Sequence, residues 1–177
     1  MVQEMTFNKY KTRGAYHYDW YKNNTFNYRD CVDKCIEFCE GSTLDVGCGE
    51  GLIVDKLTEL GYKAEGIDND RTGIELGRIG GHEIWLHDIN KPLKGKWEYM
   101  VCLNVIEHLE YPERIKEIFN HNITKAAIII TDIPQGDLPP EHVHEFTPYE
   151  LKQMFHTRKV KAFSIGKDFH GIEIYKT

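Results

Sequence analysis

A glycine-rich segment with an acid near its start is the part of this sequence best suited to hold a reactive ligand. The run LDVGCGEG, residues 44–51, leads from an apolar strand directly into a predicted helix. Its glycines allow a sharp turn and close approach of a ligand, and the helix N-terminus offers N–H groups with a partial positive charge. Asp45 repels a pyrophosphate but attracts a cationic amine, and Leu52 stands where a dinucleotide-binding loop has its third glycine. The segment therefore predicts a site for a zwitterionic ligand.

Acids also end the next two predicted strands. Asp68 lies on the order of 20 residues beyond the glycine loop, where an acid can accept hydrogen bonds from both hydroxyls of a ribose. Asp88 can bond an exocyclic amine, while Ile89 packs on a flat ring. Each acid taken alone is more often a solvated strand-end residue, but ligands of open α/β sheets bind at the carboxyl ends of the strands. The acids and the loop together predict a nucleoside-like ligand.

The stretches LDVGCGEG, GIDND, HDI and VCLNVIEHL resemble the class I S-adenosylmethionine-dependent methyltransferases, above all the group containing the ubiquinone-biosynthesis O-methyltransferases. The resemblance extends from about Ser42 to Thr177. It implies a methyltransferase enzyme with S-adenosyl-L-methionine as cofactor, and it places Asn104 and Val105 near the sulfonium. The expected cofactor-binding residues are Asp45, Gly47, Cys48, Gly49, Gly51, Asp68, Asn69, Asp88, Ile89 and Asn104.

Three histidines are candidates for the base that removes a proton from a hydroxyl or amine acceptor, because histidine titrates near neutral pH. His108 follows the fourth predicted strand, His144 follows the fifth, and His17 lies in an aromatic N-terminal segment. For His108 the alternative is a capping or packing role. For His17 the alternative is an arm that simply covers the core rather than a lid that excludes water. We expect all three at the acceptor side as catalytic residues.

A metal-dependent activity is the main alternative. Glu107, His108 and His144 resemble part of the metal site of the small-RNA 3′-terminal 2′-O-methyltransferases, with Asn104 in place of the first acid. An amide in that position weakens a divalent site, so we expect no bound metal. A non-catalytic cofactor-binding subunit is a second alternative. Asp45 and Leu52 argue against a third alternative, a dinucleotide-dependent oxidoreductase.

Composition narrows the classes of partner. The 177 residues carry a formal net charge of -6, whereas proteins that coat nucleic acid by charge have a basic balance. The longest apolar run, residues 126–130, is too short to cross a bilayer, and the N-terminal residues lack the apolar core of a signal peptide. We therefore expect a cytoplasmic enzyme acting on a small molecule or a sugar, with nucleic acid unlikely as a partner. The oligomeric state is not readable from the sequence.

Alternating strands and helices must position these residues. Strands are predicted at about residues 42–48, 62–68, 83–87, 97–103, 125–131, 160–166 and 171–175, and helices at about 28–40, 51–60, 71–79, 112–120 and 147–155. Such alternation favours a mostly parallel sheet covered on both faces. The last two strands lie too close in sequence for a parallel crossover and should pair antiparallel.

The resemblance sharpens this to a three-layer, Rossmann-like α/β fold with seven strands, the last one antiparallel. We expect an aromatic arm or lid over residues 1–26 and a single methyltransferase domain over residues 27–177. Cys31, Cys35 and Cys39 recur every four residues, which stacks them on one helix face and predicts buried thiols rather than a metal cluster. Gly41 is expected to end their helix in a left-handed cap.

Overall fold

Seven strands form a single sheet in the order β3-β2-β1-β4-β5-β7-β6 in the computed structural model, which describes residues 14–134 and 142–176. The strands are β1 (Thr43–Val46), β2 (Ala64–Asp68), β3 (Ile84–Leu86), β4 (Trp97–Leu103), β5 (Ile123–Asp132), β6 (Lys159–Ile165) and β7 (Phe169–Tyr175). Strands β3, β2, β1, β4 and β5 pair in parallel, while β7 is antiparallel to both β5 and β6. The predicted fold class and the closing hairpin are confirmed.

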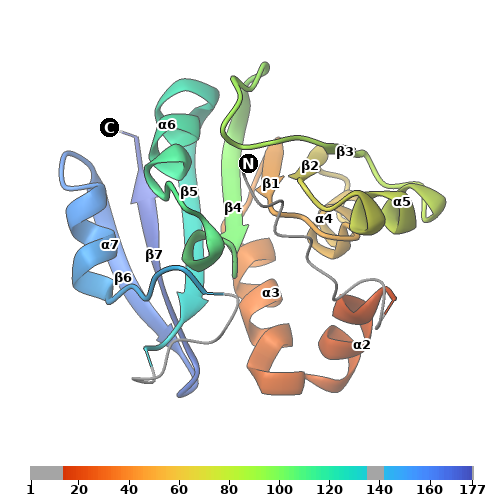
Figure 1. Cartoon of the computed structure of the whole chain (residues 1–177), viewed down its shortest axis with the longest axis horizontal. Coiled ribbons are helices and arrows are strands. Elements are labelled where there is room, and N and C mark those ends of the chain that lie inside the picture. Colours follow the sequence, from red (N-terminus) through yellow and green to blue (C-terminus); the bar gives the residue numbers. More distant parts are fainter. Residues whose placement is uncertain (1–13, 135–141, 177) are drawn as a thin grey trace, which may run out of the picture.

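Helices cover both faces of this sheet. They are α2 (Tyr16–Asn23), α3 (Tyr28–Phe38), α4 (Leu52–Glu59), α5 (Arg71–Ile79), α6 (Glu113–Asn122) and α7 (Pro148–Met154), with short 3-10 turns η1 (Thr25–Asn27) and η2 (Ile106–His108). Helices α3 and α4 pack into one apolar cluster, and α6 and α7 pack into the other, on the opposite face. In Figure 1, β6 and α7 lie at the left of the molecule and α5 lies at the right.

Strand alternation builds these two cores. Ile128 and Ile130 of β5 belong to the cluster under α3, whereas Ile129 between them belongs to the cluster under α6 and α7. All three are fully buried. A parallel strand covered on both faces therefore reads as a continuous apolar run, which is the pattern that residues 126–130 show.

The three regularly spaced cysteines pack in the hydrophobic core. Cys31, Cys35 and Cys39 are buried in the cluster under α3, and all five cysteines are free thiols. Burial is the main cause that raises the pKa of each of these three thiols. They are therefore protonated, unreactive core side chains, as predicted.

Two features of the N-terminal region differ from expectation. Helix α2 forms inside the predicted arm, where no helix was expected; the first part of that arm, residues 1–13, lies outside the described residues. The prediction of a left-handed cap at Gly41 is wrong, because α3 ends at Phe38 and Cys39 is extended, with φ -93° and ψ 118°. A Cβ on Gly41 would meet the carboxylate end of the flexible Glu98 side chain.

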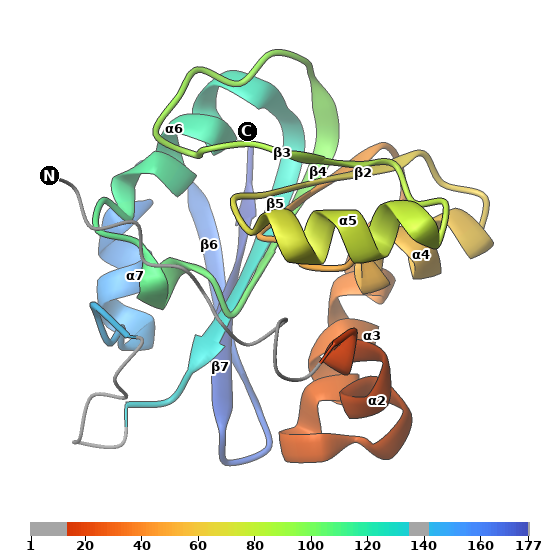
Figure 2. The same cartoon turned by 45° about the vertical axis from the view of Figure 1, so that its right-hand side comes forward.

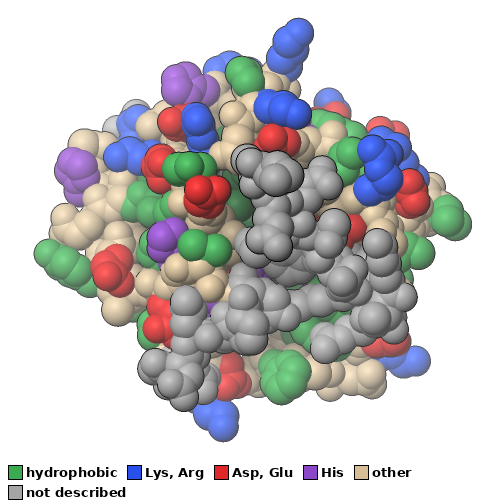
Figure 3. All heavy atoms as spheres, in the orientation of Figure 1, with side chains coloured by type: hydrophobic (Ala, Val, Ile, Leu, Met, Phe, Trp, Pro, Cys, Tyr) green, Lys and Arg blue, Asp and Glu red, His purple; other side chains and the backbone are tan. Residues whose placement is uncertain are grey.

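No helix among the described residues is long and apolar enough to cross a bilayer. On the face seen in Figure 3, lysines and arginines are interspersed with aspartates and glutamates.

The cap of α7 gives a stability test. The Thr147 hydroxyl accepts from the Glu150 N–H at 3.2 Å, and the Glu150 carboxylate accepts from the Thr147 N–H at 2.8 Å, which together form a capping box. Replacing Thr147 by Ala should lower the free energy of unfolding by about 1 kcal/mol in urea denaturation. Thr147→Ser keeps the hydroxyl and should stay close to wild type; equal losses in both variants would contradict the capping role.

Candidate functional site

One cavity lies at the carboxyl ends of the parallel strands, where the sequence places its candidate residues. Its volume is about 720 Å³, within the range of roughly 300–1,000 Å³ typical of small-molecule sites. The glycine loop and the ends of β2 and β4 line one side, helix α2 and η1 another, and residues 131–134 and 142–145 a third. Both ribbon views show α2 beyond this end of the sheet (Figures 1 and 2).

Backbone conformation and, at Gly47, close packing explain why the loop contains glycines. Gly47, Gly49 and Gly51 have φ of 76°, 55° and 89°, a region that favours glycine. A Cβ on Gly47 would also lie 2.2 Å from a methyl carbon of Val105. The Gly47 N–H donates to the Ile67 carbonyl at 2.8 Å, which ties the loop to β2. These angles and contacts constrain the shape of the loop.

Asp45 is a buried acid that opens on the cavity. Only 3% of its surface is exposed, and no hydrogen bond to its carboxylate is found among the described residues. Burial, with a smaller contribution from the charge of Asp68, raises the pKa of Asp45 from 3.8 to about 8. A carboxylate in this position is stabilised by a cation, so the site fits a ligand that carries an ammonium group.

Asp68 connects β2 to the glycine loop. Its Oδ2 accepts from the Gly49 N–H at 2.8 Å, and its Oδ1 accepts from the Asp70 N–H at 2.7 Å. Burial raises the pKa of Asp68, and the two N–H donors oppose that rise. Each carboxylate oxygen can accept more than one bond, so Asp68 retains capacity for a ligand hydroxyl.

The structure brings together most of the predicted cofactor residues. Those that line the cavity are Asp45, Gly47, Cys48, Asp68, Asn69, Ile89 and Asn104, while Gly49 and Gly51 shape the loop backbone. Asp88 is not among the described lining residues; its Oδ1 accepts from the Asn90 N–H at 2.9 Å. The neighbouring His87 lines the cavity instead, and its Nε2 is buried without a hydrogen-bond partner.

Asn104 carries a strained backbone at the end of β4. Its φ is 52°, uncommon for a residue other than glycine, and its N–H donates to the Ile130 carbonyl at 2.9 Å. The side-chain Oδ1 is buried without a hydrogen-bond partner while the residue lines the cavity. Strain combined with an unsatisfied polar atom is typical of positions where a ligand completes the site.

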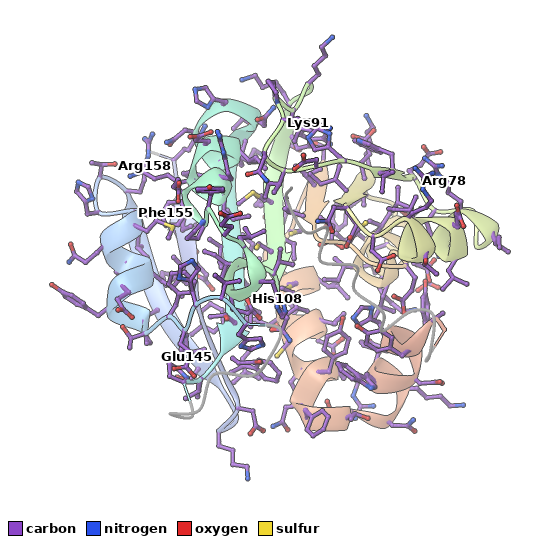
Figure 4. The ribbon with its side chains drawn as sticks, in the orientation of Figure 1. Arg78, Lys91, His108, Glu145, Phe155 and Arg158 are labelled. Carbon is purple, nitrogen blue, oxygen red and sulfur yellow. The ribbon has the colours of Figure 1, made fainter. Side chains whose placement is uncertain are left out.

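A histidine cluster forms the side of the cavity away from the glycine loop. The Glu107 carbonyl accepts from the N–H groups of Val143 and His144 at 2.8 and 3.1 Å, which holds residues 142–144 against η2. The rings of His108 and His142 meet edge to face at 4.8 Å between centroids. Figure 4 shows the labelled His108 near the lower end of β4. His108, His142 and His144 all line the cavity, so the two histidine segments converge.

His17 lies away from this cluster, on the glycine loop. Its Nδ1 lies 2.5 Å from the Oε2 of Glu50, and its backbone N–H donates to the Oε1 of Glu50 at 2.7 Å. It lines the same cavity from α2. The expected catalytic role of His17 stays a prediction.

The predicted site residues did not include three residues that line or shape the site, namely His142, Asp132 and Glu50. His142 Nε2 lies 3.6 Å from Asp132 Oδ2, and Glu50 is only 1% exposed. Asp132 ends β5, so the strand-end rule that selected Asp68 applies to it as well. Glu50 had no comparable signal, because its partner His17 is 33 residues away in sequence.

The same cluster has ligand atoms spaced for a metal. One atom from each of Glu107, His108 and His142 lies within 4.8 Å of the others, the one such group among the described residues. His144, which the sequence favoured as the third ligand, is not part of the group, and its Nε2 is buried without a hydrogen-bond partner.

Comparison with known proteins identifies the family. A family model described as a methyltransferase domain matches residues 27–159. A ubiquinone biosynthesis O-methyltransferase of Dechloromonas aromatica is 23% identical, in an alignment that covers 78% of each chain. Four further curated relatives align over 30% to 41% of their own lengths, so the chain spans less than half of each of them.

Solved structures share the fold. The magnesium protoporphyrin IX methyltransferase of Synechocystis PCC 6803, crystallised with bound SAH, has a TM-score of 0.74 and 13% identity, with 96% of this chain and 97% of that chain covered. A SAM-dependent methyltransferase of Archaeoglobus fulgidus has a TM-score of 0.71 and 16% identity, with 95% and 97% covered. At these identities the likeness concerns the fold.

The raised pKa of Asp45 predicts a stability gain when its charge is removed. Between pH 3.8 and about 8 the native state holds a proton that the unfolded chain has lost, so stability falls as pH rises through this window. Asp45→Asn should therefore be more stable than wild type in urea without ligand, by a margin that grows from pH 5 to pH 8. Asp88→Asn, which removes a partly exposed acid at another strand end, should show no such margin. An Asp45→Asn variant no more stable than wild type at pH 8 would contradict the assignment.

Proposed function

Because this chain belongs to the methyltransferase domain family and is an S-adenosylmethionine-dependent methyltransferase, we propose that it methylates an oxygen or nitrogen atom of a small molecule or sugar. The observation that carries this proposal is the division of one cavity into two chemically different sides. Asp45, Asp68 and Asn104 line the side next to the glycine loop, and His108 and His142 line the other. A cofactor on the first side presents its reactive end to the second.

The cofactor side fits S-adenosylmethionine by the chemistry of its donors. Asp45 lacks a hydrogen-bonding partner among the described residues and suits the ammonium group, and Asp68 suits the ribose hydroxyls. Ile89 and the glycine loop offer apolar and backbone contacts to the rest. When bound, S-adenosylmethionine supplies a methyl group on a sulfonium, whose carbon–sulfur electron pair stays on sulfur as the acceptor's lone pair forms the new bond.

On the acceptor side, His142 is placed to take up the acceptor proton. The Asp132 carboxylate lies 3.6 Å from its Nε2, too far for a hydrogen bond but close enough to act as a counter-charge. His108 packs edge-on against His142 and limits the rotation of the ring. Since the leaving group is already activated, holding the acceptor in line accounts for much of the rate, and the base adds to it.

Removal of this base is expected to slow turnover without loss of cofactor. His142→Ala should lower kcat by about 10²- to 10⁴-fold, because the acceptor proton loses its destination. Binding of S-adenosylhomocysteine in calorimetry should stay within about threefold of wild type. His156→Ala, at an exposed histidine on the surface of the same domain, should retain full activity.

The assay uses radiolabelled S-adenosylmethionine with a panel of hydroxylated and aminated small molecules and sugars. Label transfer that persists unchanged in His142→Ala would remove His142 from the mechanism. A wild-type protein that fails to bind S-adenosylhomocysteine would overturn the proposed cofactor site itself.

A second candidate function is metal-dependent methylation of RNA ends, and the cluster of Glu107, His108 and His142 favours it. Two histidines and one carboxylate suit first-row divalent metals. Against an RNA substrate stand the net charge of -6 and the mixture of charges on the surface in Figure 3. The same imidazoles cannot serve as a free base and as metal ligands at once, so the two candidates are mutually exclusive.

Chelation of metal ions with EDTA distinguishes the two candidate functions. If the cluster holds an essential metal, methyl transfer should fall at least tenfold in EDTA and return on addition of Mn²⁺ or Zn²⁺, and Glu107→Gln should weaken metal binding in calorimetry. If His142 is a base, EDTA should leave turnover unchanged on a small-molecule acceptor. Unchanged turnover on short RNA in EDTA would reject the metal-dependent candidate.

A further inference from the structure

Three basic side chains meet at the last turn of α6. Lys96 lies just before β4, Arg158 just before β6 and Lys176 just after β7. Lys96 Nζ donates to the His121 carbonyl. On Asn120, the carbonyl accepts from Lys176 Nζ at 2.9 Å, and the side-chain Oδ1 accepts from Arg158 Nη2 at 3.2 Å. Lys96, Arg158 and Lys176, here called the basic cluster, therefore converge on two neighbouring residues.

The basic cluster lies at the end of the sheet opposite the cavity. Strands β4 and β6 begin at this end, and the antiparallel strand β7 ends there. None of its three residues lines the cavity. Figure 4 shows Arg158 at the upper left of the molecule and His108 near the lower end of β4. The basic cluster is therefore a separate surface that the proposed function leaves unused.

The basic cluster lacks acidic partners. Other lysines at this end of the sheet form ion pairs, since Lys125 and Lys161 lie 2.6 and 3.5 Å from carboxylate oxygens. Within the part of the chain that the structure describes, no carboxylate pairs with Lys96, Arg158 or Lys176. Burial and the charges of Arg158 and Lys96 lower the pKa of Lys176. Like charges are thus held together in a chain whose formal net charge is -6.

Capping of α6 explains only part of this arrangement. Cations near a helix C-terminus are favourable because the last carbonyls carry a partial charge of about half a unit. One lysine offsets that charge, whereas the basic cluster has three cations. Each lysine bonds to one carbonyl and keeps further N–H donors, and Arg158 Nε is buried without a hydrogen-bond partner. Positive charge and donors therefore remain for an anionic ligand.

We propose that Lys96, Arg158 and Lys176 form a second ligand site, which binds inorganic phosphate or the phosphate group of a monoester. A phosphate dianion matches the excess charge, and its oxygens accept from a guanidinium and from ammonium groups at the same time. Because the three side chains converge on Asn120 and His121, they suit one compact group better than an extended acidic chain. The site is independent of the methyl acceptor.

Titration with inorganic phosphate tests the inference, by calorimetry and by urea denaturation at constant ionic strength with sodium chloride as the reference salt. Phosphate should raise the free energy of unfolding above its value in chloride, because a ligand of the folded state stabilises it. Arg158→Gln should weaken phosphate binding roughly 10-fold, as expected for a lost hydrogen bond to a charged group. Lys96→Gln should act in the same direction. Lys63→Gln, which removes a lysine that is 72% exposed elsewhere, is the matched control and should leave phosphate binding unchanged.

Lys96→Gln decides the matter if Arg158→Gln impairs folding, because Lys96 is exposed. Equal stability of the wild type in phosphate and in chloride would overturn the inference, as would an unchanged phosphate affinity in Lys96→Gln. Displacement of phosphate by S-adenosylhomocysteine would place the anion in the cavity and would overturn it as well. Binding of a short RNA with hydroxyl ends, without binding of phosphate, would replace the proposed site by a surface for phosphodiesters.

Discussion

Burial of the Asp45 carboxylate at the end of a central parallel strand is the constraint around which this site is arranged. An acid buried to this degree costs stability when it is charged, and the charge of the nearby Asp68 adds to that cost. The strand cannot turn it outward, because the pleat directs Leu44 and Val46 into the core on the other face. The cost is therefore inherent in the register of β1, and in the proposed cofactor site the ammonium group of the ligand offsets it.

The remainder of the cofactor side follows from that position. The glycine loop must leave β1 without covering Asp45, and its positive φ angles achieve this where Val105 leaves no room for a side chain on Gly47. Asp68 fastens the loop to β2 through Gly49. Stability and function oppose each other here, since the same carboxylate that weakens the empty fold provides the attraction for a ligand.

The opposite side of the cavity is built around a cluster of histidines. Its histidines come from two segments, η2 and residues 142–144, that are joined by backbone hydrogen bonds to the Glu107 carbonyl. This arrangement gathers the imidazole rings of three histidines in one part of the cavity lining. Whether the cluster works as a base or as a metal ligand set depends on what occupies it, because the spacing of Glu107, His108 and His142 permits both.

The sequence by itself determined the fold class, the alternation of strands and helices from α3 onward, the buried cysteine face and the acids at the ends of β1 and β2. These follow from local periodicity, and a parallel sheet converts strand ends into neighbours. Only the tertiary structure decided that His142 rather than His144 joins His108, that His87 rather than Asp88 lines the cavity, and that His17 pairs with Glu50. Those contacts join residues from separate loops and from α2, and side chains on such segments are directed by packing across the molecule rather than by any repeat along the chain.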